Sequence, residues 1–189
     1  MSSFRIFQVI ALVLVCSLPA FTQTAKNFTK EGLSFNYPSA WNLQDASKND
    51  AQQLTLARSD SDAQIRLFVY RSKIETPDKL ADAKHKLVDT YVDSTAKTFE
   101  QMGARPERSP ASTEIGGVKA EGVKIRAVLE GEAGAAEIYW VVLGERLVVM
   151  TFFGPDRSLK QMNAAWDVVR TSVQIEGSKP QATPSPSPE

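Results

Sequence analysis

The stretch that decides the fold is Ile138–Phe153, which reads IYWVVLGERLVVMTFF. Two runs of β-branched, aromatic and long apolar residues flank Gly144-Glu145-Arg146, a short connection typical of a tight turn between strands. Alternate residues of a strand point to opposite faces of a sheet, and here both alternating sets are apolar, as in Trp140 and Val141. We therefore predict two antiparallel strands at the centre of a sheet that is covered on both faces.

One long helix is available to cover the first face. Thr76 suits the N-cap, Pro77 the first helical position and Gly103 the left-handed position after the last turn. Between these signals the apolar residues recur at helical spacing and predict one buried stripe, which consists of Leu80, Leu87, Val88, Tyr91, Thr95, Phe99 and Met102.

A second helix is predicted after Gly154-Pro155-Asp156. Ser158 and Gln161 have the spacing of a capping box, in which a serine caps the helix and a glutamine three residues later reaches back. The apolar residues at helical spacing are Leu159, Met162, Trp166, Val169 and Val173. This helix would cover the second face.

The remaining strands lie upstream of the central pair. Leu33, Phe35 and Tyr37 alternate with polar residues up to Pro38, as in a half-buried strand. Turn signals predict two hairpins: Leu54–Arg58 with Ile65–Arg71 across 59–62, and Thr113–Ile115 with the chain from Val118 onward across Gly116-Gly117. Residues 123–129 have the alternation of a strand. The expected fold class is α+β, with a central antiparallel β-sheet flanked by helices on both faces, an α/β/α sandwich.

The two ends of the chain do not have the pattern of a packed domain. Residues 1–25 have one basic residue, Arg5, then an apolar run to Ala20 that is shorter than the ~20 residues a spanning helix needs. This pattern predicts a signal peptide cleaved near Ala20 or Ala25, with an uncleaved membrane anchor as the alternative. Residues 26–177 would form a single domain, and the Pro/Ser-rich residues 178–189 a disordered tail.

Export predicts a periplasmic or secreted protein with no stable membrane span after cleavage. The only cysteine of the sequence, Cys16, falls inside the leader, so thiolate chemistry, disulfides and zinc–thiolate sites are excluded from the rest of the chain. Lipid attachment at Cys16 is disfavoured, since the preceding residue is Val15 rather than a small residue.

Charge excludes one class of partner. The chain has 22 basic and 22 acidic residues, and removal of the leader, with its single Arg5, leaves 21 against 22. A protein that neutralises many phosphates needs a basic excess, so we expect no nucleic-acid binding.

Few residues are candidates for chemistry. His85 is the only histidine, and Asp82 and Asp89 at helical neighbour spacing could orient it as a general base, although a solvated histidine at the edge of the stripe is the favoured interpretation. The acidic turns 60–62 and 130–132 could hold a weak calcium ion, but such residues are expected in turns anyway. Four aromatic residues could line a pocket, although core packing is favoured: Tyr37, Trp41, Tyr70 and Trp140. We predict no catalytic, cofactor-binding or metal-binding residue and no cofactor.

Two segments resemble a known family. The run Gly32-Leu33-Ser34-Phe35-Asn36-Tyr37-Pro38 followed by Trp41 resembles the first strand of the PsbP-like family, and the run 166–173, WDVVRTSV, resembles its last helix. The resemblance spans about residues 28–176 in pattern and implies an antiparallel sheet between helices. Proteins of this fold include an extrinsic subunit of the photosynthetic water-splitting complex, nuclear-transport factors that bind a small GTPase, and bacterial envelope proteins, so it implies no single activity.

Three hypotheses for function follow. The first is a non-catalytic envelope protein that acts as a binding or accessory module for a partner protein or a cell-surface component. The second is a small-ligand carrier with a cleft between sheet and helix, lined by Tyr139 or Trp140. The third is a hydrolase that uses His85 with an acid. A bacterial envelope protein fits the short leader best, and no functional residue of the family maps onto a motif here.

Overall fold

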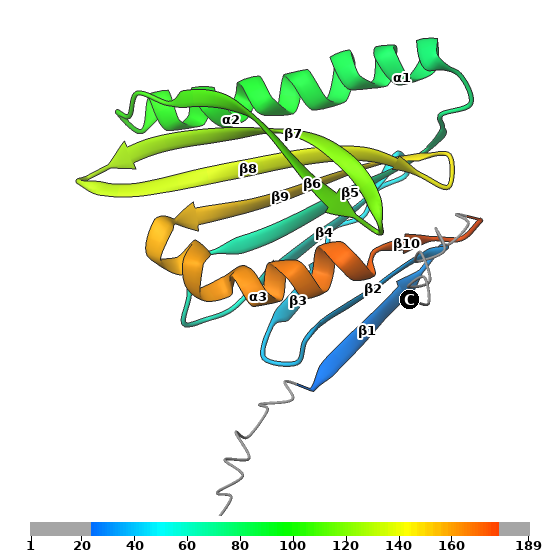
Figure 1. Cartoon of the computed structure of the whole chain (residues 1–189), viewed down its shortest axis with the longest axis horizontal. Coiled ribbons are helices and arrows are strands. Elements are labelled where there is room, and N and C mark those ends of the chain that lie inside the picture. Colours follow the sequence, from blue (N-terminus) through cyan, green and yellow to red (C-terminus); the bar gives the residue numbers. More distant parts are fainter. Residues whose placement is uncertain (1–23, 178–189) are drawn as a thin grey trace, which may run out of the picture.

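A seven-stranded antiparallel sheet forms the centre of the molecule (Figure 1). The computed structural model describes residues 24–177, so the predicted signal peptide, except for its last two residues, and the predicted tail lie outside the described residues. The strand order is β3-β4-β5-β9-β8-β7-β6, and the bounds are β3 Asn42–Asp45, β4 Ala51–Ala57, β5 Gln64–Lys73, β6 Glu107–Ile115, β7 Val118–Leu129, β8 Glu132–Leu143 and β9 Arg146–Pro155. The predicted hairpins are confirmed, including the turn at Gly116 and Gly117, whose φ angles are 57° and 78°.

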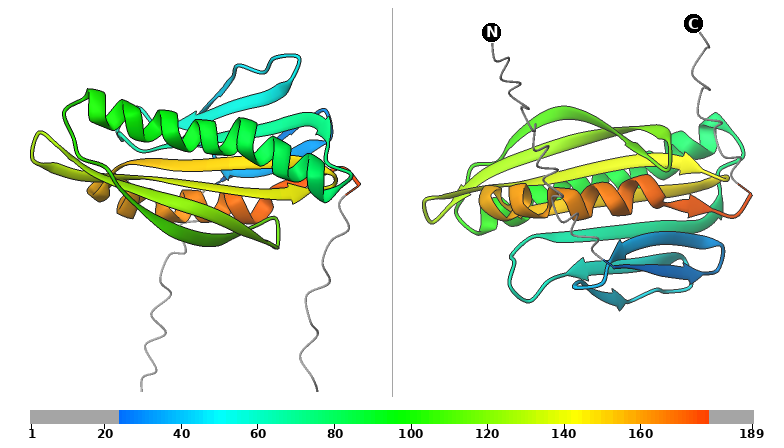
Figure 2. Two further views of the ribbon diagram at one scale, coloured as in Figure 1. Left: turned by 90° about the horizontal axis from the view of Figure 1, so that it is seen from above. Right: turned by 60° about the horizontal axis from the view of Figure 1, so that its bottom comes forward.

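Both faces of this sheet are covered, as the sequence predicts. One face packs against a long helix made of α1 (Pro77–Ala83), η1 (Lys84–Asp89) and α2 (Thr90–Gln101), and the other packs against α3 (Asp156–Ser172) (Figures 1 and 2). Along β9, Leu147 and Val149 join the core under the long helix, whereas Val148 and Met150 join the core under α3. All four are at most 3% exposed, which confirms the α+β fold with a sheet between helices.

A second, three-stranded sheet shares the α3 side of the molecule. Its order is β1-β2-β10, with β1 Ala25–Lys30, β2 Leu33–Pro38 and β10 Gln174–Ile175. Leu33 and Phe35 of β2 are buried in the same core as Trp166 and Val169 of α3. The sandwich therefore has a small additional sheet (Figure 2). The sequence predicts its strand β2 but neither of the strands that pair with it.

The long helix begins as predicted and then departs from a regular α-helix. Thr76 accepts a hydrogen bond from the Lys79 backbone N–H, and Pro77 follows at the first helical position. Residues 84–89 form a π-helical turn, which shifts the buried stripe so that Val92 is buried in it. The prediction for Met102 is wrong: this residue is the C-cap, where the helix ends, and it is 61% exposed.

The predicted capping box of the second helix is also wrong. Helix α3 begins at Asp156 directly after Pro155, and no side chain caps its first turn. Ser158 lies inside the helix and is 5% exposed. Because Pro155 occupies the N-cap, Ser158 falls at the third helical position and cannot act as the cap. The apolar stripe itself is confirmed, with Met162, Trp166 and Val169 buried.

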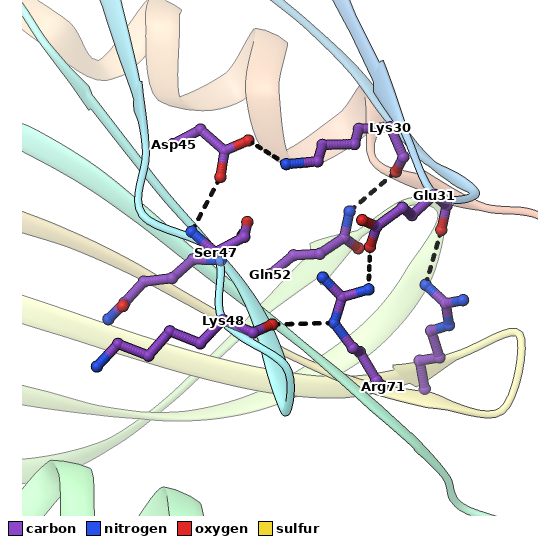
Figure 3. A network of polar contacts seen from close by, with 9 residues as sticks. Lys30, Glu31, Asp45, Ser47, Lys48, Gln52 and Arg71 are labelled. Atoms are coloured by element: carbon purple, nitrogen blue, oxygen red, sulfur yellow. Dashed lines mark hydrogen bonds and ion pairs between the residues drawn. The ribbon is translucent and has the colours of Figure 1, made fainter.

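Polar contacts fasten the β1–β2 hairpin to the large sheet (Figure 3). At the hairpin turn, the Glu31 carboxylate pairs with Arg71 of β5, and the Glu31 carbonyl accepts a hydrogen bond from Arg146 Nη1 at 3.0 Å. The Lys30 carbonyl accepts a hydrogen bond from Gln52 Nε2 at 2.9 Å, and Lys30 Nζ lies 2.7 Å from Asp45. The hydrogen bond from Lys30, together with those from Ser47, lowers the pKa of Asp45 to about 2. The hairpin is thereby held against β3, β4, β5 and β9.

None of the helices within residues 24–177 is long and apolar enough to cross a membrane.

Candidate functional site

His85 lies on the π-helical turn and points into solvent. Its side chain is 84% exposed, and Nδ1 lies 3.6 Å from Asp89. Asp82, the other acid that could orient it, pairs instead with Lys86 at 2.7 Å. A groove of about 580 Å³ runs past His85 and Asp89 toward Arg108, whose guanidinium pairs with Asp93 at 2.6 Å. His85 is thus a solvated histidine at the edge of the helix stripe, in the favoured interpretation of the sequence.

The two acidic turns that could hold calcium lie near one end of α3. Asp60 pairs with Arg58, which lowers the pKa of that carboxyl. Arg157, in the first turn of α3, lies 3.8 Å from Asp62 and 2.9 Å from Glu132, and so connects the two turns. These carboxylates are neutralised by guanidinium groups. Within residues 24–177 no group of three or more histidine, cysteine, aspartate or glutamate side chains is arranged to hold a metal ion.

The aromatic residues form core rather than a pocket at the predicted position. Tyr139 is 6% exposed and its ring lies 6.0 Å from that of Trp166. Trp140 is covered by Lys84, whose Nζ lies 5.2 Å from the ring centroid, and Trp41 is 3% exposed. Because Tyr139 is packed against Trp166, the carrier hypothesis does not hold for a cleft lined by that residue.

A half-buried acid lies beside this aromatic stack. Glu137 accepts hydrogen bonds from Lys124 Nζ at 2.6 Å and from the Tyr139 hydroxyl at 3.0 Å. Burial, with Glu137 as the second cause, raises the pKa of Tyr139, so its hydroxyl stays a proton donor to the carboxylate. Lys124 and Glu137 are direct partners across β7 and β8. The arrangement is a cross-strand ion pair at the border of the core, next to a polar cavity of about 390 Å³ that also borders Lys160.

A further concavity with a largely apolar lining lies where α2 ends. This end of α2 is at the left of Figure 1. The concavity has a volume of about 560 Å³. We call it the α2-end recess, and its apolar wall consists of Phe99, Met102, Ala127, Leu129, Gly134 and Phe153. It therefore opens between the last turn of the long helix and the ends of β7, β8 and β9.

Small residues make the recess hollow. Helix α2 ends at Gln101, so no further turn covers the ends of the strands. Beneath this point the strands carry Ala127 and Gly134 rather than large side chains. Gly134 is required by close strand packing, because a Cβ atom there would lie 2.8 Å from the Gly154 carbonyl oxygen. The sheet thus leaves an apolar floor that is not filled by its own side chains.

The mouth of the recess is acidic. Glu130 and Glu132, from the turn between β7 and β8, line it, and none of the described lining residues is lysine, arginine or histidine. Glu132 pairs with Arg157, whereas Glu130 has no ion-pair partner among residues 24–177. Glu130 has a φ of 52° and is followed by Gly131 at 84°, as in the tight hairpin turns that favour glycine. The recess therefore combines apolar walls with one unpaired carboxylate.

Sequence reasoning missed this recess, although a signal was present. The strand β8 begins with Glu132-Ala133-Gly134-Ala135-Ala136, a run of small residues in an otherwise bulky sheet. Such a run predicts either close packing or a gap in the surface, and only the position of the helix end decides between the two.

Comparisons with known proteins show the fold. No family model matches the chain, and no curated protein matches it. The solution structure of cyanobacterial PsbP from Synechocystis sp. is similar at 14% identity and a TM-score of 0.52, over 86% of this chain and 98% of that protein. A crystal structure of a protein from Bacteroides thetaiotaomicron is similar at 18% identity and a TM-score of 0.52. The match covers 82% of this chain but only 50% of that protein. The chain therefore has the PsbP-like fold, as the resemblance in its sequence predicts.

Proposed function

We propose that this chain is an exported accessory protein of the cell envelope, which binds a partner protein and catalyses no reaction. The observation that carries the proposal is the α2-end recess, an open apolar concavity with Met102 61% exposed at its wall. A concavity with mostly apolar walls and a few polar groups at its rim is the usual form of a binding site. Buried side chains cover both faces of the sheet, so the recess is a surface feature beside a complete core.

Export is supported by the leader pattern of residues 1–25 and by the cysteine-free remainder of the sequence. The start of the folded part favours one of the two cleavage positions. Ala25 begins β1 and pairs with Pro38, so cleavage near Ala20 would leave β1 whole, whereas cleavage after Ala25 would remove its first residue.

The absence of catalysis is supported by how the candidate groups are arranged. The His85–Asp89 pair is exposed and its two side chains are 3.6 Å apart, so it lies in open solvent rather than in an enclosed catalytic site. Both carboxylate oxygens of Glu137 already accept hydrogen bonds, one from Lys124 and one from Tyr139. A hydrolase would need a nucleophile beside its base. Of the described residues that line this groove, only Ser109 is a serine, and it lies across the groove from His85.

A second candidate function is a small-ligand carrier, because the volume of the recess lies within the range of roughly 300–1,000 Å³ common for ligand pockets. Native mass spectrometry of the purified chain separates the two functions. A carrier would show a bound molecule of defined mass that is lost in Ala127→Leu, a substitution that fills the floor of the recess.

The proposal is tested by affinity capture followed by titration. The mature chain is immobilised and incubated with envelope extract of the source cell, alongside Met102→Ser and the control Val168→Ser, which changes an exposed apolar residue on α3. We expect one partner to be retained by the wild type and by the control. After purification, that partner should bind Met102→Ser about tenfold more weakly, since the lost apolar contact is worth about 1.4 kcal/mol. Equal binding by all three proteins, or no retention by the wild type, would contradict the proposal.

A further inference from the structure

The charges around the α2-end recess indicate the chemistry of the segment that fills it, and this inference rests on the function proposed above. We propose that the recess receives a short segment of a partner protein in which apolar side chains are flanked by lysine or arginine.

The apolar part of the segment follows from the walls. Phe99 comes from the last turn of α2 and Phe153 comes from the end of β9, and both line the recess with Met102. The Arg66 guanidinium lies 4.5 Å from the centroid of the Phe153 ring, so the cation nearest this wall already lies over an aromatic ring. Methionine adapts to irregular apolar surfaces because its side chain is unbranched and flexible. A volume of about 560 Å³ has room for more than one apolar side chain.

The basic part of the segment follows from the mouth. Of the two carboxylates that line the recess, Glu132 is already neutralised by Arg157. Glu130 has no such partner among the described residues. A cation on the incoming segment would pair with Glu130, whereas an acidic residue at the same place would be repelled, so the mouth selects for lysine or arginine.

A protein segment fits better than a small molecule because the recess is open. Pockets for small ligands bury about 70–90% of the ligand surface. Here the wall residue Met102 is 61% exposed and Leu129 is only partly buried, so a lone molecule would remain largely in water. A chain segment gains further contacts on the protein surface beside the recess, which include the Glu130–Glu132 turn.

The test uses two fluorescein-labelled hexapeptides with capped termini. Both contain Leu-Phe, flanked by lysine in the basic peptide and by glutamate in the acidic peptide. Each is titrated by fluorescence anisotropy against the mature wild type, Met102→Ser, Glu130→Gln and the control Glu145→Gln. Glu145 is a matched control because it is also a hairpin-turn glutamate with positive φ, at the opposite end of β8. Amide NMR shifts of Met102 and Gly134 report whether a bound peptide lies in the recess.

We expect the basic peptide to bind with a Kd below about 1 mM and to shift the Met102 and Gly134 amides. Met102→Ser should weaken it about tenfold and Glu130→Gln about two- to fivefold, as for a loss of apolar contact and of an exposed charge pair, while Glu145→Gln leaves it unchanged. Equal binding of both peptides, or binding that moves other amides, would overturn the inference while the proposed function stands.

Two further outcomes would also overturn it. Failure of both peptides to bind, with partner capture still lost in Met102→Ser, would mean that the recess is used by a segment of different chemistry. The second outcome concerns dodecyltrimethylammonium, which is titrated below its micellar concentration. If it shifts the amides of Met102 and Gly134 while the basic peptide does not bind, the small-ligand carrier is favoured and the proposed function is contradicted as well.

Discussion

Gly122 of β7 lies directly opposite Tyr139 of β8, under the aromatic ring. A Cβ atom at Gly122 would lie 2.3 Å from Cδ1 of Tyr139, and the same ring stacks against Trp166 of α3. Strand β7 therefore has a glycine where α3 presses an aromatic stack onto the sheet.

Substitution Gly122→Ala should lower the free energy of unfolding by about 1–3 kcal/mol, because Tyr139 must move in a filled core. The measurement is urea denaturation followed by tryptophan fluorescence, to which Trp41, Trp140 and Trp166 contribute. The neighbouring substitution Glu121→Ala, on an exposed side chain, serves as control and should change stability by at most about 0.5 kcal/mol. Equal stability of both variants would show that the ring does not press on Gly122.

The buried amide of Gln52 gives a second prediction. Gln52 is fully buried and donates to the Lys30 carbonyl, and its Oε1 has no partner among the described residues. In Gln52→Glu, a carboxylate would face that carbonyl, so burial would raise the pKa of the introduced group. The stability of the Gln52→Glu variant would be greatest at low pH, where the introduced group is protonated. It would fall as the pH rises through the raised pKa.

We therefore expect Gln52→Glu to be destabilised more at pH 7 than at pH 4, relative to the wild type at each pH. Thermal denaturation at the two pH values measures the difference. Gln53→Glu, one residue along β4 and only partly buried, is the matched control and should show little difference between the two conditions. A pH-independent loss in Gln52→Glu would contradict the buried contact with Lys30.

Asp45 predicts how the hairpin responds to acid. Its folded-state pKa of about 2 is below the ordinary value of 3.8, first because of the bond from Lys30. A lowered pKa contributes stability above pH 3.8, and this contribution is lost as the pH falls toward 2. At pH 6 the free energy of unfolding of the wild type should be higher than that of Asp45→Asn by on the order of 1 kcal/mol. The difference is no larger because solvent screens this exposed pair. Urea denaturation should show the two proteins converging at pH 2, and a constant difference would refute the assignment.

The acidic turns give a prediction for calcium. Asp60 and Glu132 are already paired with Arg58 and Arg157. We expect calcium at about 5 mM to leave the unfolding temperature unchanged, because a ligand stabilises the folded state only when it binds there. A rise with calcium that is abolished by Asp60→Asn or by Glu132→Gln would establish a site at these turns.

Local signals were sufficient for both helices and for the centre of the large sheet, but not for its edge strand β3, which no pattern predicts, nor for the first residues of β6. Thr76 and Pro77 mark a helix start by their own chemistry, and the apolar runs of β8 and β9 require cover on both faces. The small sheet could not be predicted in the same way. Its strand β10 has only two residues, and they pair with Leu33 and Ser34, which lie far from β10 in the sequence. Such strands depend on tertiary contact rather than on local pattern.

The recess escaped prediction for a related reason. A cavity is an absence of side chains, and Ala127 and Gly134 indicate one only after the end of α2 is known to stop short of them. The exposed position of Met102 follows from the same helix end, since the helical spacing alone places it in the buried stripe.

The most direct test of the account is site-specific photo-crosslinking in cells that export the full chain. Benzoylphenylalanine is placed at Met102, on the wall of the recess, or at Val168, an exposed apolar residue of α3. We predict one discrete cross-linked product in the envelope fraction from the first position and none from the second. No product from the position of Met102, or the same products from both positions, would contradict the claim that the recess binds a partner.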